Sequence, residues 1–203
     1  MPELSVALWL VYLMIAFGLR VLVQLRTTGR TGLVSLRTLA TPLERVAGAS
    51  FVLALVGGFA SALLPLLGWR TAWLAPWRVA EPLVWLGGGA YVVGVVSTFA
   101  AQLAMGSAWR IGVDVAERTE LVADGLFAFV RNPIFTGLLL TAAGLALLCG
   151  SWLAWSSFAL LVLALQLQVR GVEEPYLERT HGDAYRAYAD RVGRFWPGVG
   201  FGV

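Results

Sequence analysis

The residues of this chain that could do chemistry lie in two polar segments, 106–132 and 170–203, which flank a long apolar tract. Together they hold 9 of the 12 acidic residues, mixed with arginine and aromatic side chains. The first segment runs into FVRNPIFTG, so Arg131 stands where the apolar tract begins. An arginine there can bind a carboxylate through two parallel hydrogen bonds, or it can anchor a helix among lipid headgroups. Its position alone leaves both roles open.

The second segment reads RGVEEPYLERTHGDAYRAYADRVGRFWP. Glu173-Glu174-Pro175 predicts the start of a helix, because acidic residues are stabilised near a helix N-terminus. Gly182-Asp183 predicts a break in that helix and the cap of a second short one. The positions that could share one face are Leu177, Tyr185, Tyr188 and Val192. An amphipathic tail lying on the membrane is the alternative, which the paired acids disfavour because anionic lipids repel them.

Composition indicates that these segments belong to an integral membrane protein. The 203 residues are 59% apolar and only 13% charged, whereas a soluble domain carries about 25% charged residues. All 15 basic residues are arginine, so no lysine can act as a Schiff base or general base. The net charge of +3 favours contact with membrane lipids and argues against nucleic acid. The single histidine, His181, excludes a multi-histidine site, and we expect no metal.

A membrane-spanning helix needs about 20 mostly apolar residues. Three stretches meet this requirement: residues 4–25, 46–67 and 82–105. Residues 133–169 are nearly uncharged over 37 residues, which is too long for one span, and CGSW at 149–152 predicts a turn. We therefore expect a helical hairpin with arms at about 133–149 and 152–169. Arg20, in the first stretch, is close enough to one end to extend its charge toward the headgroups.

The predicted fold is an all-α polytopic membrane bundle of about five transmembrane helices. Loops on one side hold 12 arginines and the loop on the other holds 2, and cytoplasmic loops carry the excess of positive charge. We expect a bacterial-type inner membrane, an external N-terminus and a cytoplasmic C-terminus. The first stretch has no basic region or small-residue cleavage site, so it is expected to be retained. The run Gly87-Gly88-Gly89 predicts a close helix contact.

The two polar segments resemble the isoprenylcysteine carboxyl methyltransferase family and its phospholipid methyltransferase relatives. The resemblance covers about residues 103–197 and rests on LVADGLFAFVRNPIFTG and EEPYLERTHGDAYRAYADRVGRFWP; MGSAWRIGV also looks like the family's preceding segment. The family pattern is Gly-x-aromatic-x-x-x-Arg-His-Pro-x-aromatic-x-Gly, then Glu-Glu-x-x-Leu, Gly-x-x-Tyr-x-x-Tyr and Arg-aromatic-x-Pro. It matches at Gly125, Phe127, Arg131, Asn132, Pro133, Phe135, Gly137, Glu173, Glu174, Leu177, Gly182, Tyr185, Tyr188, Arg194, Phe195 and Pro197.

The resemblance implies S-adenosylmethionine as cofactor and methyl donor. Residues 1–105 would form three N-terminal transmembrane helices, and residues 106–203 a catalytic region of cytoplasmic loop, hairpin and C-terminal helical tail that binds the cofactor. The implied catalytic residues are Arg131, Glu174 and Asn132. The implied cofactor-binding residues are Trp109, Leu121, Val122, Gly125, Phe127, Arg131, Asn132, Pro133, Phe135, Glu173, Glu174, Tyr185 and Arg194.

Each chemical group of that cofactor has candidate partners. Arg131 or Arg194 could hold its carboxylate, and Glu173 or Glu174 its ammonium or ribose hydroxyls. The aromatic side chains that could face adenine or the sulfonium are Trp109, Phe129, Phe135 and Tyr185. Two positions depart from the family pattern: Asn132 replaces the commoner His and Phe135 the commoner Tyr. Asparagine keeps a donor and an acceptor but does not titrate near neutral pH.

The predicted function is methyl transfer to a lipophilic acceptor. Positioning supplies much of the rate in such a reaction, about 7–11 kcal/mol of barrier reduction. A carboxylate is already ionised at neutral pH, whereas an amine would need a base, for which Glu173, Glu174 or a tyrosine are the candidates. The missing motif histidine therefore favours an isoprenylcysteine-like carboxylate or a thiol over a phospholipid amine. The other readings are an NADPH-dependent membrane sterol or enone reductase and a non-catalytic membrane protein; the oligomeric state stays open.

Overall fold

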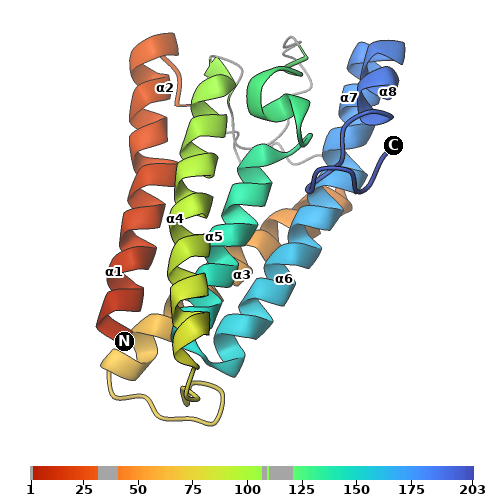
Figure 1. The fold of residues 1–203 in the computed structure, drawn as a ribbon. Helices are drawn as coiled ribbons and strands as arrows, with labels where there is room; N and C mark the ends of the chain where they lie inside the picture. The colour runs from red at the N-terminus through yellow and green to blue at the C-terminus, as the bar shows by residue number, and fades with distance from the viewer. Residues whose placement is uncertain (1, 32–40, 107–108, 110–120) are drawn as a thin grey trace.

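The computed structural model describes residues 2–31, 41–106, 109 and 121–203. It is a bundle of long helices, with no strand among these residues (Figure 1). Within the described part of the chain, four helices are long and apolar enough to cross a membrane: Pro2–Thr28, Pro42–Leu66 (α3), Glu81–Ala104 (α4) and Trp152–His181. A fifth apolar helix, α5 (Pro133–Cys149), is shorter. The chain is an integral membrane protein, and the all-α polytopic bundle that the sequence predicts is confirmed.

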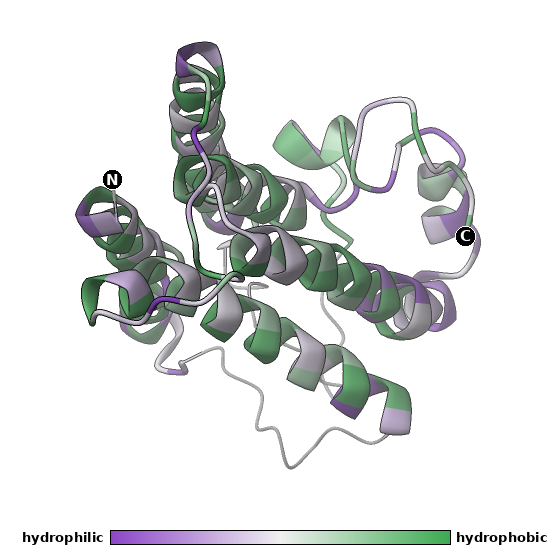
Figure 2. Cartoon of the chain, turned by 90° about the horizontal axis from the view of Figure 1, so that it is seen from below, coloured by the Kyte–Doolittle hydropathy of each residue, from purple (hydrophilic) through white to green (hydrophobic). Residues whose placement is uncertain are grey.

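Local sequence explains where several of these helices begin and turn. The first span joins α1 (Pro2–Leu13), a π-helical segment (Met14–Leu19) and α2 (Arg20–Thr28). Thr41 and Glu44 form a capping box at the start of α3, with Pro42 in the first turn. Hydrophobic residues run along the whole length of the helices, and hydrophilic ones gather near their ends (Figure 2).

The predicted hairpin is confirmed, with its turn at Gly150-Ser151. Gly150 adopts the left-handed conformation, φ 55° and ψ 43°, that ends α5. Ser151 then caps α6 (Trp152–Gln168), its hydroxyl accepting a hydrogen bond from the backbone N–H of Ala154 at 3.3 Å. Both signals are local, so the sequence alone places this turn correctly.

The helix predicted to start at Glu173-Glu174-Pro175 is present from Glu174, but it is not separate from the hairpin. The second arm of the hairpin runs on as a helix of 30 residues to His181, through a π-helical segment (Val169–Glu173) into α7 (Glu174–His181). The N–H of Glu174 bonds to the carbonyl of Val169, five residues back. The hydrogen-bond ladder thus shifts just before Pro175, which has no N–H to contribute. Glu174 therefore stands on a continuous extension of a membrane helix.

The break and the cap predicted at Gly182-Asp183 are confirmed, with Gly182 as the capping residue. Gly182, with φ 54°, separates α7 from α8 (Asp183–Ala189) and is itself the residue before the first turn of α8. Asp183 is the first residue within the helix rather than its cap. A glycine suits this position because its φ lies in the left-handed region.

Helices α4 and α5 pack closely through small residues. A Cβ added at Gly144 would lie 2.5 Å from the carbonyl oxygen of Gly87, and one at Gly94 would lie 2.5 Å from the backbone nitrogen of Thr141. Gly88 has nothing within 4 Å of that position, and neither has Gly89. The close contact predicted from the glycine run is therefore confirmed for Gly87 and wrong for its two neighbours. This packing holds α5 close against α4 in the bundle.

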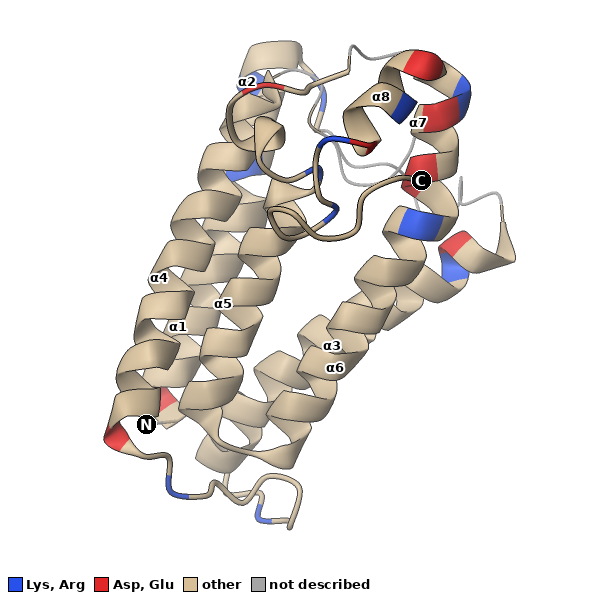
Figure 3. Cartoon of the chain, turned by 45° about the vertical axis from the view of Figure 1, so that its right-hand side comes forward, with Lys and Arg blue, Asp and Glu red and all other residues tan. Residues whose placement is uncertain are grey.

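Charged residues gather mainly at one end of the bundle, together with α7, α8 and the 3₁₀ turn Gly125–Ala128 (Figures 1 and 3). We call this the site end. The N-terminus and the loop 67–80, which holds Arg70 and Arg78, lie at the opposite end. The predicted separation of the arginines therefore agrees with the fold; Arg37, Arg110 and Arg118 fall outside the described residues. Which end faces the cytoplasm stays a prediction.

Candidate functional site

At the site end, the C-terminal segment folds back onto the start of α5. The N–H of Arg131 donates to the carbonyl of Gly193 at 2.8 Å, and the N–H of Asn132 donates to the carbonyl of Arg194 at 3.1 Å. The side-chain amide of Asn132 donates to the same carbonyl at 3.0 Å. Two segments some 60 residues apart in the chain are thus joined by backbone hydrogen bonds, as the sequence-based site requires.

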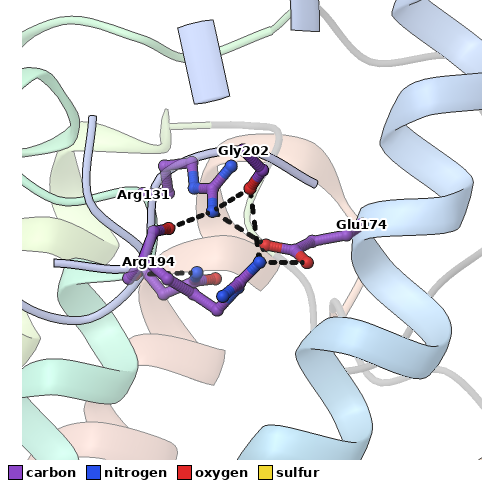
Figure 4. Close-up of polar contacts among 6 residues, drawn as sticks. Arg131, Glu174, Arg194 and Gly202 are labelled. Atoms are coloured by element: carbon purple, nitrogen blue, oxygen red, sulfur yellow. Dashed lines mark hydrogen bonds and ion pairs between the residues drawn. The ribbon is translucent and has the colours of Figure 1, made fainter. Parts of the chain in front are cut away.

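Glu174 reaches from α7 between two arginines of this junction (Figure 4). Its Oε1 lies 3.1 Å from Arg131 Nη2 and 2.6 Å from Arg194 Nε, and its Oε2 lies 3.0 Å from Arg194 Nη2. The side chains are 2% exposed for Arg131, 4% for Glu174 and 9% for Arg194. We call these three residues the Arg–Glu–Arg cluster. It is a buried ion-pair network whose two arginines outnumber its one acid.

Part of Arg131 has no partner in the described protein. Its Nη2 donates to the carbonyls of Gly200 and Gly202, at 2.9 Å and 2.8 Å. Its Nε and Nη1 are buried without any hydrogen-bond acceptor. A buried donor left unsatisfied costs about 1–3 kcal/mol, and more when charged. Two such N–H groups on one cation mark a place where an anionic ligand would be stabilised.

A small second core supports the cluster from the side of α8. It contains Tyr185, Tyr188 and Val192, with Leu121 and Leu177 packed against them, so the face predicted from the sequence is confirmed. The Tyr188 hydroxyl donates to the carbonyl of Phe127 at 2.6 Å and thereby ties α8 to the 3₁₀ turn.

The two tyrosines of this core are poor bases. Burial raises the pKa of Tyr188 to about 12. Burial, and then the charge of Glu174, raise the pKa of Tyr185 above its usual value. Both phenols are neutral near pH 7, so they can donate hydrogen bonds there but do not accept protons. This argues against the tyrosine that the sequence left open as a base for an amine.

Other residues of the predicted site lie around the cluster rather than in it. Pro133 is buried as the first residue of α5, and Phe135 is half-buried against the main core of the bundle. Gly125 begins the 3₁₀ turn with φ 55°. Val122 is half-buried and Phe129 is 66% exposed. Their role toward a cofactor stays a prediction.

Trp109 and Glu173 have other neighbours. Trp109 is 2% exposed, and its ring lies 4.6 Å from the guanidinium carbon of Arg20. Arg20 is 1% exposed and donates to the carbonyl of Gly106 at 2.7 Å. The expected extension of Arg20 toward the headgroups is therefore wrong: its side chain is buried against a carbonyl and an aromatic ring, and its Nε has no hydrogen-bond partner among the described residues. Glu173 is half-buried and accepts a hydrogen bond from Gln168 at 3.2 Å. The rest of MGSAWRIGV falls largely outside the described residues.

Sequence reasoning missed three contributors to the cluster. The carbonyls of Gly200 and Gly202 bind Arg131, and no sequence pattern marks a carbonyl as a ligand. Thr136 donates to the carbonyl of Phe195 at 2.7 Å and so joins α5 to the C-terminal segment a second time. Thr136 lies within FVRNPIFTG, one helical turn after Asn132. Its position in that motif is the sequence feature from which this contact could have been predicted.

Comparison with known proteins assigns the family. The model of the phospholipid methyltransferase family matches residues 82–184, just over half of the chain. The chain therefore belongs to the phospholipid methyltransferase family. It is also similar to Protein-S-isoprenylcysteine O-methyltransferase of Schizosaccharomyces pombe, with 35% identity over 72 residues, which are 36% of this chain and 30% of that protein. The match thus spans less than a third of the relative's length. The family predicted from the sequence is confirmed.

Proposed function

We propose that this chain is an S-adenosylmethionine-dependent methyltransferase that acts on a lipophilic acceptor at the membrane. Membership of the family supports methyl transfer, and the apolar helices support an acceptor that partitions into lipid. The observation that carries the proposal is the pair of buried, unpartnered donors on Arg131, held beside Glu174. In this proposal residues 1–105 are the N-terminal spans, residues 106–203 are the catalytic region, and the site end is cytoplasmic.

The residues present fit that cofactor. Arg131 Nε and Nη1 would bind its carboxylate, because they are charged, buried and without an acceptor. Glu173 offers a half-buried carboxylate one residue before the cluster, where it would bind the ammonium or a ribose hydroxyl. The bound cofactor supplies a methyl group activated on a sulfonium. No Gly-rich phosphate loop is needed for a ligand without phosphates.

The chain's own residues would act by positioning. Arg194 holds Glu174 through two hydrogen bonds, and Glu174 in turn fixes the direction of Arg131. Asn132 ties the start of α5 to the carbonyl of Arg194. A rigid, buried cluster of this kind aligns donor and acceptor without reorganising during the reaction. Asn132 does not titrate near neutral pH and the phenols stay neutral, so the arrangement suits an acceptor that is already ionised.

An isoprenylcysteine-like carboxylate or a thiol is therefore the proposed acceptor class. N-methylation of a phospholipid amine is the second candidate, which the description of the matching family favours. The two differ in the base they need, since an amine must lose a proton and a carboxylate does not. Assays with membranes containing carboxylate, thiol and amine lipids distinguish them, and methylation of amines alone would overturn the first choice.

Binding of S-adenosylhomocysteine to purified protein in detergent tests the cofactor site directly. We expect Arg131→Ala to abolish binding measured by titration calorimetry, while circular dichroism shows unchanged helicity. Arg191→Ala is the matched control, because Arg191 is an exposed arginine at the same end. NADPH in place of S-adenosylhomocysteine tests the reductase alternative. Equal affinity of Arg131→Ala and wild type for S-adenosylhomocysteine, or binding of NADPH alone, contradicts the proposal.

A further inference from the structure

An open groove lies beside the second hairpin arm, where α6 passes into the π-helical segment Val169–Glu173. It has a volume of about 420 Å³ and is lined by Leu43 of α3 and by Gln166, Leu167, Arg170 and Gly171. Leu43 lies directly over Gly171, where an added Cβ would collide with its side chain. The groove therefore lies where the start of α3 meets the helix that carries Glu174.

The spacing of its residues connects this groove to the cluster. Gln166, Arg170 and Glu174 follow one another at intervals of four along one continuous helix. Four residues make close to one turn in α-helical geometry and in the wider π-helical one, so the three side chains lie along the same side. Neighbours at this spacing have Cβ atoms about 5–6 Å apart. A ligand in the groove thus ends one helical turn from Glu174.

The chemistry of the lining is that of an amphipathic site. Leu43 and Leu167 supply apolar walls, and Arg170 supplies an exposed cation. Among the described residues, Arg170 has no ion pair with a carboxylate. Gln166 Oε1 is buried and accepts no hydrogen bond there. An apolar wall, a cation and an orphaned acceptor together fit a lipid-like molecule whose headgroup carries one anion and one N–H or O–H.

We propose that this groove binds the acidic headgroup of the amphipathic methyl acceptor, a carboxylate lipid, and that Arg170 selects it by charge. Gln166 accepts a hydrogen bond from the same headgroup, and the apolar tail leaves along Leu43 and Leu167 toward the bilayer. The inference rests on the proposed function. In the reaction, a carboxylate oxygen forms a bond to the methyl carbon as the bond from sulfur to that carbon breaks. The electron pair stays on sulfur, the two opposite charges cancel, and no proton moves.

The test uses the full chain in phosphatidylcholine vesicles without any methyl donor. The probes are a sixteen-carbon fatty acid carrying a diazirine and the corresponding alcohol; after irradiation, adducts are mapped by mass spectrometry. We expect the acid to label the stretches around residue 43 and residues 166–171 more strongly than the alcohol does. Arg170→Gln should lower labelling by the acid about tenfold, the loss of one charge-assisted hydrogen bond. Arg170→Lys should restore most of it, and Arg191→Gln, the matched exposed arginine, should leave it unchanged.

Any one of three labelling results overturns the inference. They are adducts elsewhere in the chain, equal labelling by acid and alcohol, and labelling that survives Arg170→Gln. Displacement of the acid by phosphatidylglycerol at equal mole fraction would assign the groove to phospholipid phosphates and also overturn it. Binding of S-adenosylhomocysteine is measured on the same samples. Wild type that binds it but fails the labelling test refutes the groove alone, whereas wild type that does not bind it refutes the proposed function while the labelling stays interpretable.

Discussion

Replacing Glu174 by glutamine tests whether the Arg–Glu–Arg cluster is the buried network that the structure shows. The substitution keeps the shape of the side chain and removes its charge. Two guanidinium groups, 2% and 9% exposed, would then face each other without the carboxylate that lies 2.6 Å and 3.1 Å from them. Removing one partner of a buried ion pair costs about 3–5 kcal/mol, because the other charges stay buried and uncompensated. We expect a loss of stability of that size.

The measurement is unfolding of the purified protein in mixed micelles, titrated with sodium dodecyl sulfate and followed by circular dichroism. Glu178→Gln is the matched control. Glu178 pairs with Arg186 at 2.8 Å on the outside of α7, where the two side chains are 36% and 55% exposed. Exposed ion pairs contribute about 0–1 kcal/mol, so this variant should unfold close to wild type. If Glu174→Gln loses no more stability than Glu178→Gln, the cluster is not the network described.

Three further predictions concern packing, the tyrosine core and the π-helical segment. Gly144→Ala should cost about 1–3 kcal/mol by overpacking the contact between α4 and α5, whereas Gly88→Ala, which meets open space, should cost far less in the same titration. Burial raises the pKa of Tyr188 to about 12 in the folded protein, against about 10 in the unfolded chain. The contribution of this shift to the free energy of unfolding is therefore complete below about pH 10 and is lost as the pH rises to about 12. Tyr188→Phe should flatten that part of a curve of stability against pH. Deletion of Gly171 should turn Glu174 by about one residue, or 100°, away from the arginines and abolish S-adenosylhomocysteine binding while helicity is retained; binding equal to wild type contradicts this.

The extent to which the sequence predicts this protein depends on how local each signal is. The turn at Gly150-Ser151 follows from a left-handed glycine and a serine cap, both encoded within a few residues, and it was predicted correctly. The continuation of α6 into α7 was not predicted, because Pro175 ordinarily favours a helix start. No local sequence pattern around it predicts a π-helical segment. The close helix contact predicted at Gly87-Gly88-Gly89 was correct for Gly87 only, because a run of glycines does not show which of them faces the neighbouring helix.

The candidate site divides in the same way. The order of the two motifs and the hairpin between them predict that Arg131 and Glu174 meet, and in the structure they lie 3.1 Å apart. The partners that complete the cluster are the backbone carbonyls of Gly200 and Gly202. Their position depends on how the C-terminal segment folds, which residue types alone do not predict. The ring of Trp109 could likewise face a ligand or a cation by its chemistry alone, and in the structure it faces Arg20.

In the proposed function, the continuous helix from Trp152 to His181 would bring a lipid acceptor to a water-soluble donor. Its lower part is apolar enough to lie in the bilayer, and its upper part carries Glu174 into a cluster that is almost fully buried. A flexible joint between the two would let the acceptor and the cluster move independently, and alignment would be lost. The π-helical segment Val169–Glu173 instead continues the helix, with the Glu174 N–H bonded to the carbonyl of Val169, while it adjusts the direction of Glu174. If the proposed anion binds Arg170, its distance from the donors of Arg131 would be set by helix geometry rather than by loop conformation.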